Sequence, residues 1–541
     1  MSVSAREWRG VLLYALLLAL ISTLPYLAAW ALQTPDTVFS GFLLGTEDGN
    51  SYLGKMRIGA RGEWHFGIFY TSEQHNSAPL LFLPYIVPGQ IIGLLIGRDH
   101  PALTEALLLT FHAMRIAFGV LMVLVMYRFI AEFVRAPGLR FTALLLATLG
   151  GGFGWLLLLL GGLPPEWYIP EAFSFLIIYG LPHLALARAA LLLGLLAVIW
   201  LVKGARHDWR LYTLAASCWL LVGLAVPFYL VIVYAILGAW GLAAWQRARK
   251  FPTALFWRTV IPAAFTLPLF LYYMLTFTTN PVFAQWSAQN DLPSPSPLHY
   301  ALAYSVLAPL AFFGARCFLK TRLAPRFEVL TTRMLLVGWV LLVPLLVYLP
   351  INVQRRMAEA VIMPLALLAA VGLRLLTRQR RSWLRARAMV AAVLLPSYAL
   401  LLVGSLVSAA ARTPPLFLSA GEVAALRWLE TRVNSEDVVL AAFNTCNRIA
   451  GRTNARAFAG HGPETLFLRE KREDIARFFG GALTLAQLQA RYSSQFTLRP
   501  ITYVFVGPDE RALMNGSGDW MAGLTRVYAQ DGYEIYTVDH P

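Results

Sequence analysis

The chain has 541 residues, of which 58% are hydrophobic and only 14% charged, and its formal net charge is +16. Soluble domains carry roughly 25% charged residues, so this composition indicates a membrane-embedded helical bundle rather than a soluble protein. The positive charge does not imply a nucleic-acid partner, because membrane proteins collect Lys and Arg in their cytoplasmic loops. The three cysteines lie far apart in the sequence, so they predict neither a disulfide framework nor a metal site.

Apolar runs long enough to cross a bilayer, roughly 17–25 residues each, recur along the chain. Arg6 and Arg9 precede the first run, and no small-residue cleavage site follows it, so we expect an uncleaved helix rather than a signal peptide. The sequence predicts eleven transmembrane helices, at 9–31, 104–131, 141–161, 183–202, 211–226, 227–245, 259–277, 299–318, 334–350, 359–376 and 388–410.

The distribution of Lys and Arg predicts how these helices are oriented. If the N-terminus is cytoplasmic, the inner loops are rich in Lys and Arg, whereas the outer loops 162–182 and 278–298 have none. The only basic residues between the ninth and tenth spans are Arg355 and Arg356. This asymmetry places the first loop and the C-terminal tail on the outer face of the membrane.

The first outer loop, 32–103, contains a further apolar run at 79–97. A crossing there would move the Arg-rich segment 374–387 to the outer face, and Pro84 and Pro88 interrupt the helical pattern. We therefore expect 79–97 to be a re-entrant or interfacial hairpin, so that residues 1–412 form one transmembrane module.

From about residue 413 the composition becomes that of a soluble domain. Residues 419–433 have the apolar spacing of an amphipathic helix, and 437–443 and 501–507 are predicted buried strands. Residues 525–538 predict a hairpin that turns at Asp531-Gly532. The fold class is thus a polytopic α-helical membrane protein with a C-terminal α/β domain, 413–541, outside the membrane. Helices are expected between the strands, near 463–479 and 484–493.

The first outer loop also carries two adjacent acids, Glu47 and Asp48, in the sequence TEDGNSY. A long outer loop with an acidic motif, placed directly after the first helix, resembles the GT-C superfamily of integral membrane glycosyltransferases. The segments 349–366, 460–465 and 503–511 resemble bacterial members, so the bacterial cytoplasmic membrane is the expected location. The resemblance implies a sugar on a polyprenyl-phosphate donor, transferred with inversion to a glycan, lipid or protein acceptor at the outer face.

Such a transfer needs a base for the acceptor hydroxyl and cations for the departing phosphate. Asp48 is the candidate base and Glu47 the second choice, although an acidic turn in solvent would look the same in sequence. Arg355 and Arg356 lie in a predicted outer loop, although Lys and Arg usually collect in the inner loops. We therefore expect them to bind the donor phosphate, with snorkelling to lipid headgroups as the alternative. Glu359 follows Arg355 by four residues and is expected to orient it.

Three other residues are candidates for the site. Arg188 lies within a span, where a charge is costly, so we expect it to face the bundle interior and contribute to the donor site. Glu73 and His75 could form a second acidic site or orient the acceptor, or be ordinary loop residues. With Asp48 they could also gather a divalent cation, but no ligand spacing supports this, so no metal and no cofactor are predicted.

The tail has its own polar cluster, which includes Asn447, His461 and Glu464. It follows a predicted strand, a place where α/β domains bind ligands, but a cap that closes over the active site is an equal alternative. Two other functions stay open for the whole chain: a transporter of lipid-linked glycans, although no internal repeat supports it, and a non-catalytic membrane scaffold.

Overall fold

The computed structural model describes residues 2–204, 208–320, 327–377, 380–493, 496–514, 520–521 and 523–538. Parts of three basic inner segments, at 205–207, 321–326 and 378–379, lie outside the described residues. The chain forms two compact units. Unit 1 comprises Met1–Thr23, Ala113–Tyr273 and Asp291–Gly404, and unit 2 comprises Leu24–His112, Met274–Asn290 and Ser405–Pro541. The predicted domain border at 412/413 lies near the last of these borders, but unit 2 also takes in the first outer loop.

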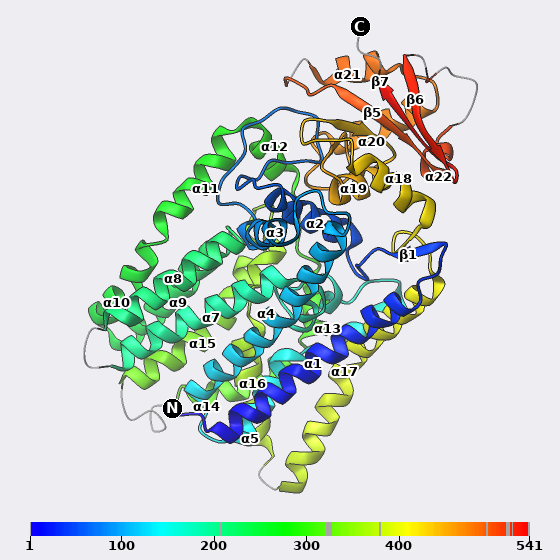
Figure 1. The fold of residues 1–541 in the computed structure, drawn as a ribbon. Coiled ribbons are helices and arrows are strands. Elements are labelled where there is room, and N and C mark those ends of the chain that lie inside the picture. Colours follow the sequence, from blue (N-terminus) through cyan, green and yellow to red (C-terminus); the bar gives the residue numbers. More distant parts are fainter. Residues whose placement is uncertain are drawn as a thin grey trace. The chain divides into compact units, whose positions relative to one another are not determined.

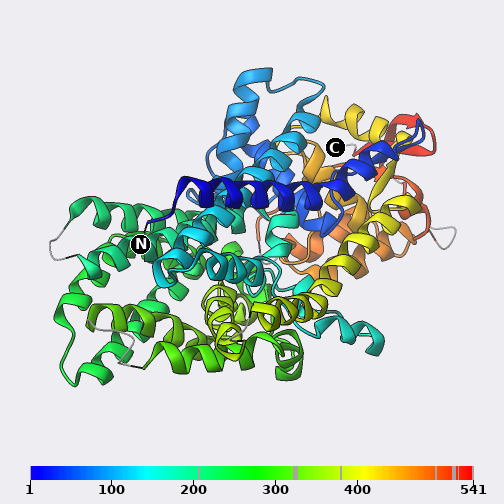
Figure 2. The same cartoon turned by 90° about the horizontal axis from the view of Figure 1, so that it is seen from below.

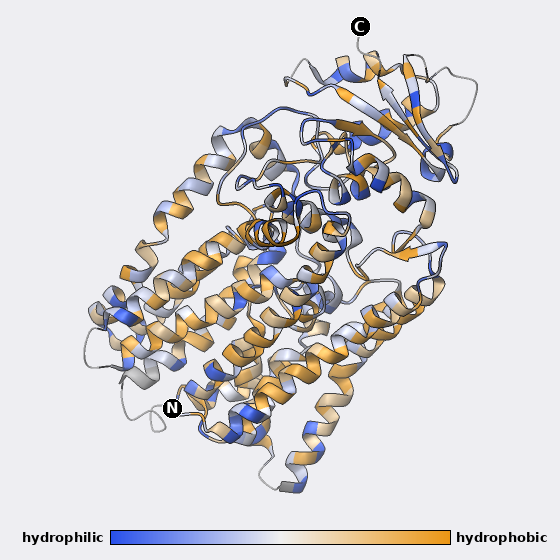
Figure 3. Ribbon diagram, in the orientation of Figure 1, coloured by the Kyte–Doolittle hydropathy of each residue, from blue (hydrophilic) through white to orange (hydrophobic). Residues whose placement is uncertain are grey.

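Unit 1 is a bundle of helices that are apolar along most of their length (Figures 1 and 3). Its most buried span is α7 (Pro182–Lys203), with 83% of its most apolar window inside the protein. The other helices that lie wholly or mostly in this unit are α1 (Ala5–Ala31), α4 (Leu103–Phe133), α5 (Pro137–Thr148), α6 (Phe175–Gly180), α8 (Trp209–Ala225), α9 (Tyr229–Ala248), α10 (Thr253–Ala264), α11 (Leu267–Thr279), α13 (Pro297–Ala303), α14 (Leu307–Phe318), α15 (Phe327–Leu346), α16 (Ile362–Leu376) and α17 (Arg380–Ala411).

Membrane-spanning length is reached by five of the helices in the described residues: α1, α4, α7, α9 and α17. Two bent pairs, α10 with α11 and α13 with α14, raise the number to seven if each pair is one span. The runs predicted at 211–226, 334–350 and 359–376 form the shorter apolar helices α8, α15 and α16, so the count of eleven stays a prediction. Figure 2 shows α1 as one unbroken helix.

One predicted span is wrong. The run 141–161 was expected to be a single helix, but α5 ends at Thr148 and the chain continues through turns into a short 3-10 helix, η1 (Gly154–Leu160). The glycines at 150–152 explain the break, because glycine disfavours a helix interior. Two further 3-10 helices, η2 (Pro165–Trp167) and η4 (Gln354–Ala358), lie in loops of unit 1.

Unit 2 is built around a five-stranded mixed sheet with the order β4-β3-β5-β7-β6. Strand β3 pairs in parallel with β4 and β5, whereas β7 pairs antiparallel with β5 and β6. A separate antiparallel pair joins β1 (Thr37–Phe39) to β2 (Phe417–Ser419). The strands of the sheet are β3 (Val438–Leu440), β4 (Arg456–Ala457), β5 (Ile501–Val506), β6 (Leu524–Gln530) and β7 (Tyr533–Val538).

The elements predicted for the tail are confirmed. The amphipathic run forms α18 (Ala420–Glu430), and Asp531 and Gly532 make the hairpin turn, both with positive φ (50° and 79°). Asp-Gly suits such a turn because both residues tolerate the left-handed region. The remaining helices of unit 2 are α2 (Thr46–Ala60), α3 (Leu83–Ile96), α12 (Pro281–Gln289), α19 (Phe443–Arg452), α20 (Leu468–Phe479), α21 (Leu485–Ser493) and α22 (Pro508–Arg511).

Helices α2 and α3 pack backbone against backbone. A Cβ atom added at Gly59 of α2 would collide with the carbonyl oxygen of Ile86, and one added at Gly89 of α3 would collide with that of Met56. Only glycine allows this approach. The hairpin expected for 79–97 is wrong: most of the segment is the single helix α3, which packs on α2. Its relation to a bilayer stays a prediction.

Candidate active site

The two acids of the first outer loop lie in a helix that the sequence did not suggest. The acids were expected in a loop, but α2 starts at Thr46, directly after Gly45 in the left-handed conformation (φ 57°). Glu47 and Asp48 thus occupy the first turn of the helix, where negative charge is favoured by the helix dipole. The Asp48 side chain is 60% exposed, whereas Glu47 is half-buried.

A loop of the C-terminal tail, residues 460–466, approaches this first turn. His461 Nε2 lies 3.2 Å from Asp48 Oδ1. The backbone N–H of Gly462 donates a hydrogen bond to Glu47 Oε1. The same loop therefore contacts both acids, and it leaves the Asp48 carboxylate largely open to solvent while fixing the Glu47 carboxylate against the backbone.

Below the acids, α2 is joined to this loop by a buried ion pair. Lys55 Nζ lies 2.6 Å from Glu464 Oε1, and both side chains are at most 4% exposed. Ser51 Oγ also donates to Glu464 Oε1 at 3.0 Å, and the Phe82 ring lies 3.9 Å from Lys55 Nζ. Removing either charge from such a pair leaves the other buried without compensation.

Amide and phenol groups complete the contact between α2 and the tail. Asn50 donates to Asn447 Oδ1 at 2.8 Å, and Asn447 Nδ2 donates to the backbone oxygen of Glu47 at 3.2 Å. The buried Tyr70 hydroxyl donates to the Asn447 backbone oxygen at 3.2 Å. Of the two roles expected for the tail cluster, these contacts match that of a cap on the acid-bearing helix.

The electrostatic environment of His461 favours its charged form. Burial by itself lowers the pKa of His461, but the carboxylates of Glu464 and Asp48 outweigh it, so the pKa is raised above that of an ordinary histidine. Burial raises the pKa of Glu464, yet Lys55 and His461 reverse this and lower it. His461 also stacks on Tyr70, with ring centroids 5.4 Å apart. The Glu464 N–H points at His461 Nδ1 at 3.3 Å, so Nε2 is the ring nitrogen that donates to Asp48.

Glu73 and His75, the expected second acidic site, are held by structural contacts. Glu73 is fully buried, and Lys471 Nζ lies 2.8 Å from its Oε2. His75 Nε2 accepts the N–H of Ile68 at 2.9 Å, and its Nδ1 lies 2.9 Å from the Glu73 backbone oxygen. Burial lowers the pKa of His75 to about 4, so the ring is neutral. Contact of either residue with an acceptor stays a prediction.

Arg188, expected at the donor site, is a fully buried residue of unit 1. Its Nε and one terminal nitrogen pair with the two carboxylate oxygens of Glu359 at 2.7 and 2.9 Å. The guanidinium also donates to Ser174 Oγ at 3.1 Å and to the Glu171 backbone oxygen at 2.7 Å. Glu359, expected to orient Arg355, pairs with Arg188 instead. In this arrangement Arg188 positions the loop 170–174.

Arg355 and Arg356 lie side by side in η4 of unit 1. The Arg355 guanidinium lies 5.7 Å from the centre of the Tyr168 ring, and that of Arg356 lies 5.1 Å from the centre of Phe228. Arg356 Nε is 3.8 Å from a Glu171 oxygen, which is beyond hydrogen-bond distance. Among the described residues neither guanidinium has a side-chain hydrogen bond, so their donors remain available to an anion.

Within the described part of the chain, no three His, Cys, Asp or Glu side chains are placed to hold a metal ion. His461 also does not suit a ligand role in the neutral state, because its Nδ1 accepts the N–H of Glu464 at 3.3 Å and its Nε2 then carries the proton. The residues around Asp48 thus do not fit a metal site made by protein ligands alone. The expectation of no metal stays a prediction.

A groove of about 590 Å³ lies next to the loop 460–466 in unit 2. Gln289 of α12 donates through its side-chain amide to the backbone oxygens of Pro463 and Thr465. The groove is lined by two carboxamides, two guanidiniums, two carboxylates and two apolar side chains: Gln285, Gln289, Arg469, Arg472, Glu470, Glu473, Phe467 and Leu468. Its charges balance, so it does not suit a strongly charged ligand.

Comparison with known proteins finds solved structures of similar fold but no sequence family to which the chain can be assigned. No protein-family model matches the chain, and no curated protein matches it. Solved structures of the Archaeoglobus fulgidus oligosaccharyltransferase do match. The apo form aligns with a TM-score of 0.55 and 15% identity over 97% of this chain and 74% of that one.

Two further forms of the same archaeal enzyme agree with this result. The complex with Zn and sulfate aligns with a TM-score of 0.53 and 15% identity over 98% of this chain and 73% of that chain. The form tethered to an acceptor peptide with the NVT sequon aligns with a TM-score of 0.55 and 14% identity over 99% and 74%. The fold class expected from the sequence, a GT-C-like helical membrane protein with a C-terminal α/β domain, is confirmed.

Proposed function

We propose that the chain is a membrane glycosyltransferase that moves a sugar from a polyprenyl-phosphate donor to an acceptor at the outer face of a bacterial cytoplasmic membrane. The observation that carries the proposal is the exposed Asp48 carboxylate, held by His461 at the first turn of α2. A fold shared with an oligosaccharyltransferase supports it. That enzyme has been solved with a tethered acceptor peptide, which supports an acceptor-binding role for this fold.

In the proposed reaction the acceptor hydroxyl loses its proton to Asp48 as its oxygen attacks the anomeric carbon. The bond between that carbon and the donor phosphate breaks, the phosphate leaves with the bonding electrons, and the sugar is inverted. His461 holds the Asp48 carboxylate in place before the attack. Glu47, whose carboxylate already accepts the Gly462 N–H, is the second candidate and suits the role less well.

The departing phosphate needs cationic partners. We assign this role to Arg355 and Arg356, because their guanidinium donors are not used by the described residues and a guanidinium forks onto phosphate oxygens. Arg188 is assigned an indirect role, since its guanidinium is already paired with Glu359. These residues belong to unit 1, so their contribution is tested by separate variants.

We further propose that the acceptor enters through the groove beside the loop 460–466. Carboxamides and balanced charges suit a neutral, hydroxyl-rich or peptide acceptor, because each group can bind two neighbouring polar atoms. The link from Gln289 to Pro463 and Thr465 ties the groove wall to the loop that holds Asp48.

A transfer assay tests the function. Wild type, Asp48→Asn and the control Asp36→Asn, an exposed acid of the same outer loop, are reconstituted in nanodiscs with a panel of polyprenyl-phosphate sugars, and donor loss is followed by mass spectrometry. We expect Asp48→Asn to lower kcat by about 10²–10⁴-fold with donor binding unchanged. Donor loss that persists at the wild-type rate in Asp48→Asn would remove Asp48 as the base. Absence of donor binding by wild type would favour the scaffold instead.

A further inference from the structure

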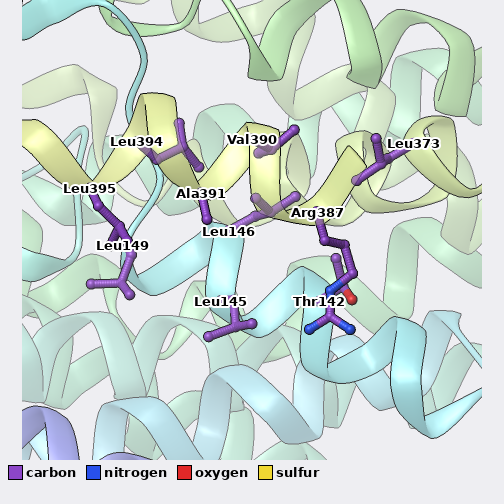
Figure 4. A pocket seen from close by; sticks show the side chains of 10 residues that line it. All are labelled: Thr142, Leu145, Leu146, Leu149, Leu373, Arg387, Val390, Ala391, Leu394 and Leu395. Atoms are coloured by element: carbon purple, nitrogen blue, oxygen red, sulfur yellow. The ribbon is translucent and has the colours of Figure 1, made fainter. Parts of the chain in front are cut away.

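A second site lies in unit 1, remote in sequence from the residues discussed so far. A cavity of about 160 Å³ opens between α5 and α17, with one side chain from α16 at its edge. Most of its lining is aliphatic, and the exceptions are Thr142 and Arg387. Figure 4 shows these two side chains together at one end of the cavity, with Leu149 and Leu395 at the other.

The polar end of the cavity carries an uncompensated positive charge. The Arg387 guanidinium lies 5.7 Å from the centre of the Trp383 ring, and the Arg374 guanidinium lies at the same distance from that ring. Among the residues that the structure describes, the ring of Trp383 is the partner of Arg387, and no carboxylate is paired with it. The hydroxyl of the buried Thr142 beside it donates to the Gly138 backbone oxygen at 2.9 Å, so the Arg387 guanidinium is the group at this end that can bind a ligand. An anion is therefore the ligand that this end of the cavity suits.

The aliphatic end of the cavity suits a hydrocarbon chain. From Arg387 to Leu395, α17 extends about 12 Å, because a helix rises about 1.5 Å per residue. Leu146, Val390 and Leu394 line this length. The outward face of α17 is apolar as well, with Met389 and Val403 exposed by 65% and 56%, as expected for a helix that faces lipid.

We propose that this cavity binds one anionic phospholipid, with the headgroup phosphate on Arg387 and part of an acyl chain along the leucines. A free phosphate would use only Arg387 and would leave the aliphatic wall unfilled, so a lipid, which fills both ends, is the better occupant. The Lys and Arg pattern of the sequence predicts that this end of α17 faces the cytoplasm. The bound lipid would thus belong to the inner leaflet, whereas the proposed reaction takes place at the outer face.

Native mass spectrometry of the full chain, delipidated and then titrated with phosphatidylglycerol or phosphatidylcholine, tests the proposal. We expect one tightly retained phosphatidylglycerol, and about fivefold weaker retention in Arg387→Ala, since one basic residue near a lipid surface contributes about 1 kcal/mol. Arg387→Lys should restore most of the binding. The matched control is Arg385→Ala, an exposed arginine of the same helix that does not line the cavity.

A second variant separates the acyl chain from the headgroup. Ala391→Phe narrows the cavity and keeps every charge, so it should weaken phosphatidylglycerol retention, while glycerol phosphate should not compete at lipid-equivalent concentrations. If Arg387→Ala and Arg385→Ala lose phosphatidylglycerol equally, the lipid binds through general surface charge, and the proposed site is overturned. Equal retention of phosphatidylcholine, or full competition by glycerol phosphate, would overturn it as well.

Discussion

Replacement of Lys55 by Met tests whether the buried ion pair to Glu464 holds the C-terminal loop on α2. The variant leaves the Glu464 carboxylate at 4% exposure with Ser51 as its remaining side-chain donor. Breaking a buried pair by removing one partner costs about 3–5 kcal/mol. With about 1.4 kcal/mol per tenfold change, local opening of this part of unit 2 should become about 10²–10⁴-fold more frequent.

Cys446 reports on that opening. It is fully buried in α19, next to Asn447, which bonds α2, and burial raises the pKa of its thiol to about 12. It is therefore inert to maleimide until the region opens. In a background with Cys218→Ala and Cys317→Ala, labelling of Cys446 gives the opening frequency, and Lys55→Met should accelerate it by the factor above. The double variant Lys55→Met with Glu464→Gln should recover part of the loss.

The matched control is Arg469→Gln, which breaks an exposed ion pair with Glu473 on α20 of the same unit. Exposed pairs contribute little, so labelling should change by less than about fivefold. Labelling of Lys55→Met at the wild-type rate would refute the reasoning, because it would mean that the buried charge of Glu464 finds compensation without Lys55.

Three further predictions concern pH, the donor and helix packing. The pKa of His461 is raised, so its contribution to stability is fully present below about pH 6.5 and is lost as the pH rises through the raised pKa. The difference in melting temperature between wild type and His461→Gln should therefore shrink as the pH rises above about 6.5. A difference that does not depend on pH would contradict this prediction. Arg356→Ala should raise KM for a polyprenyl-phosphate sugar about tenfold or more with little change in kcat, and an unchanged KM would exclude it from the donor site. Gly89→Ala should destabilise the protein by about 1–3 kcal/mol in thermal unfolding, because its Cβ would collide with the Met56 carbonyl oxygen. The control Gly10→Ala has open space around the added Cβ and should leave the melting temperature unchanged. Equal melting temperatures for the two variants would argue against the close approach of α2 and α3.

Sequence patterns predicted the parts of the fold that depend on local chemistry. The hairpin at Asp531-Gly532 and the amphipathic helix α18 follow directly from turn residues and apolar spacing. Helix α2 could not be predicted in this way, because Gly49, Gly54 and Gly59 lower its helix propensity. Those glycines are explained by tertiary contacts, since each of them packs against a neighbouring segment that a side chain would displace.

The sequence singled out the residues that meet around α2, but not which of them contact one another, and their roles in a reaction stay predictions. Asp48 and Glu47 were found from their position after the first helix, and His461 and Glu464 from their place after a strand. That His461 contacts Asp48 at 3.2 Å joins residues 413 positions apart, which no local pattern reveals. The same holds for Arg188. A charged side chain within a transmembrane span is costly, which indicated an interior position, but the sequence did not reveal Glu359 as its partner.

The glycine contacts between α2 and α3 also bear on where Asp48 would lie relative to a membrane. Asp48 lies in the first turn of α2, and α3 presents Ile91, Leu94 and Leu95 at 52–75% exposure. Since the two backbones touch at Gly59 and Gly89, the helices cannot slide past each other without losing that contact. A bilayer that took up the exposed face of α3 would therefore also fix the height of the Asp48 carboxylate relative to the lipid.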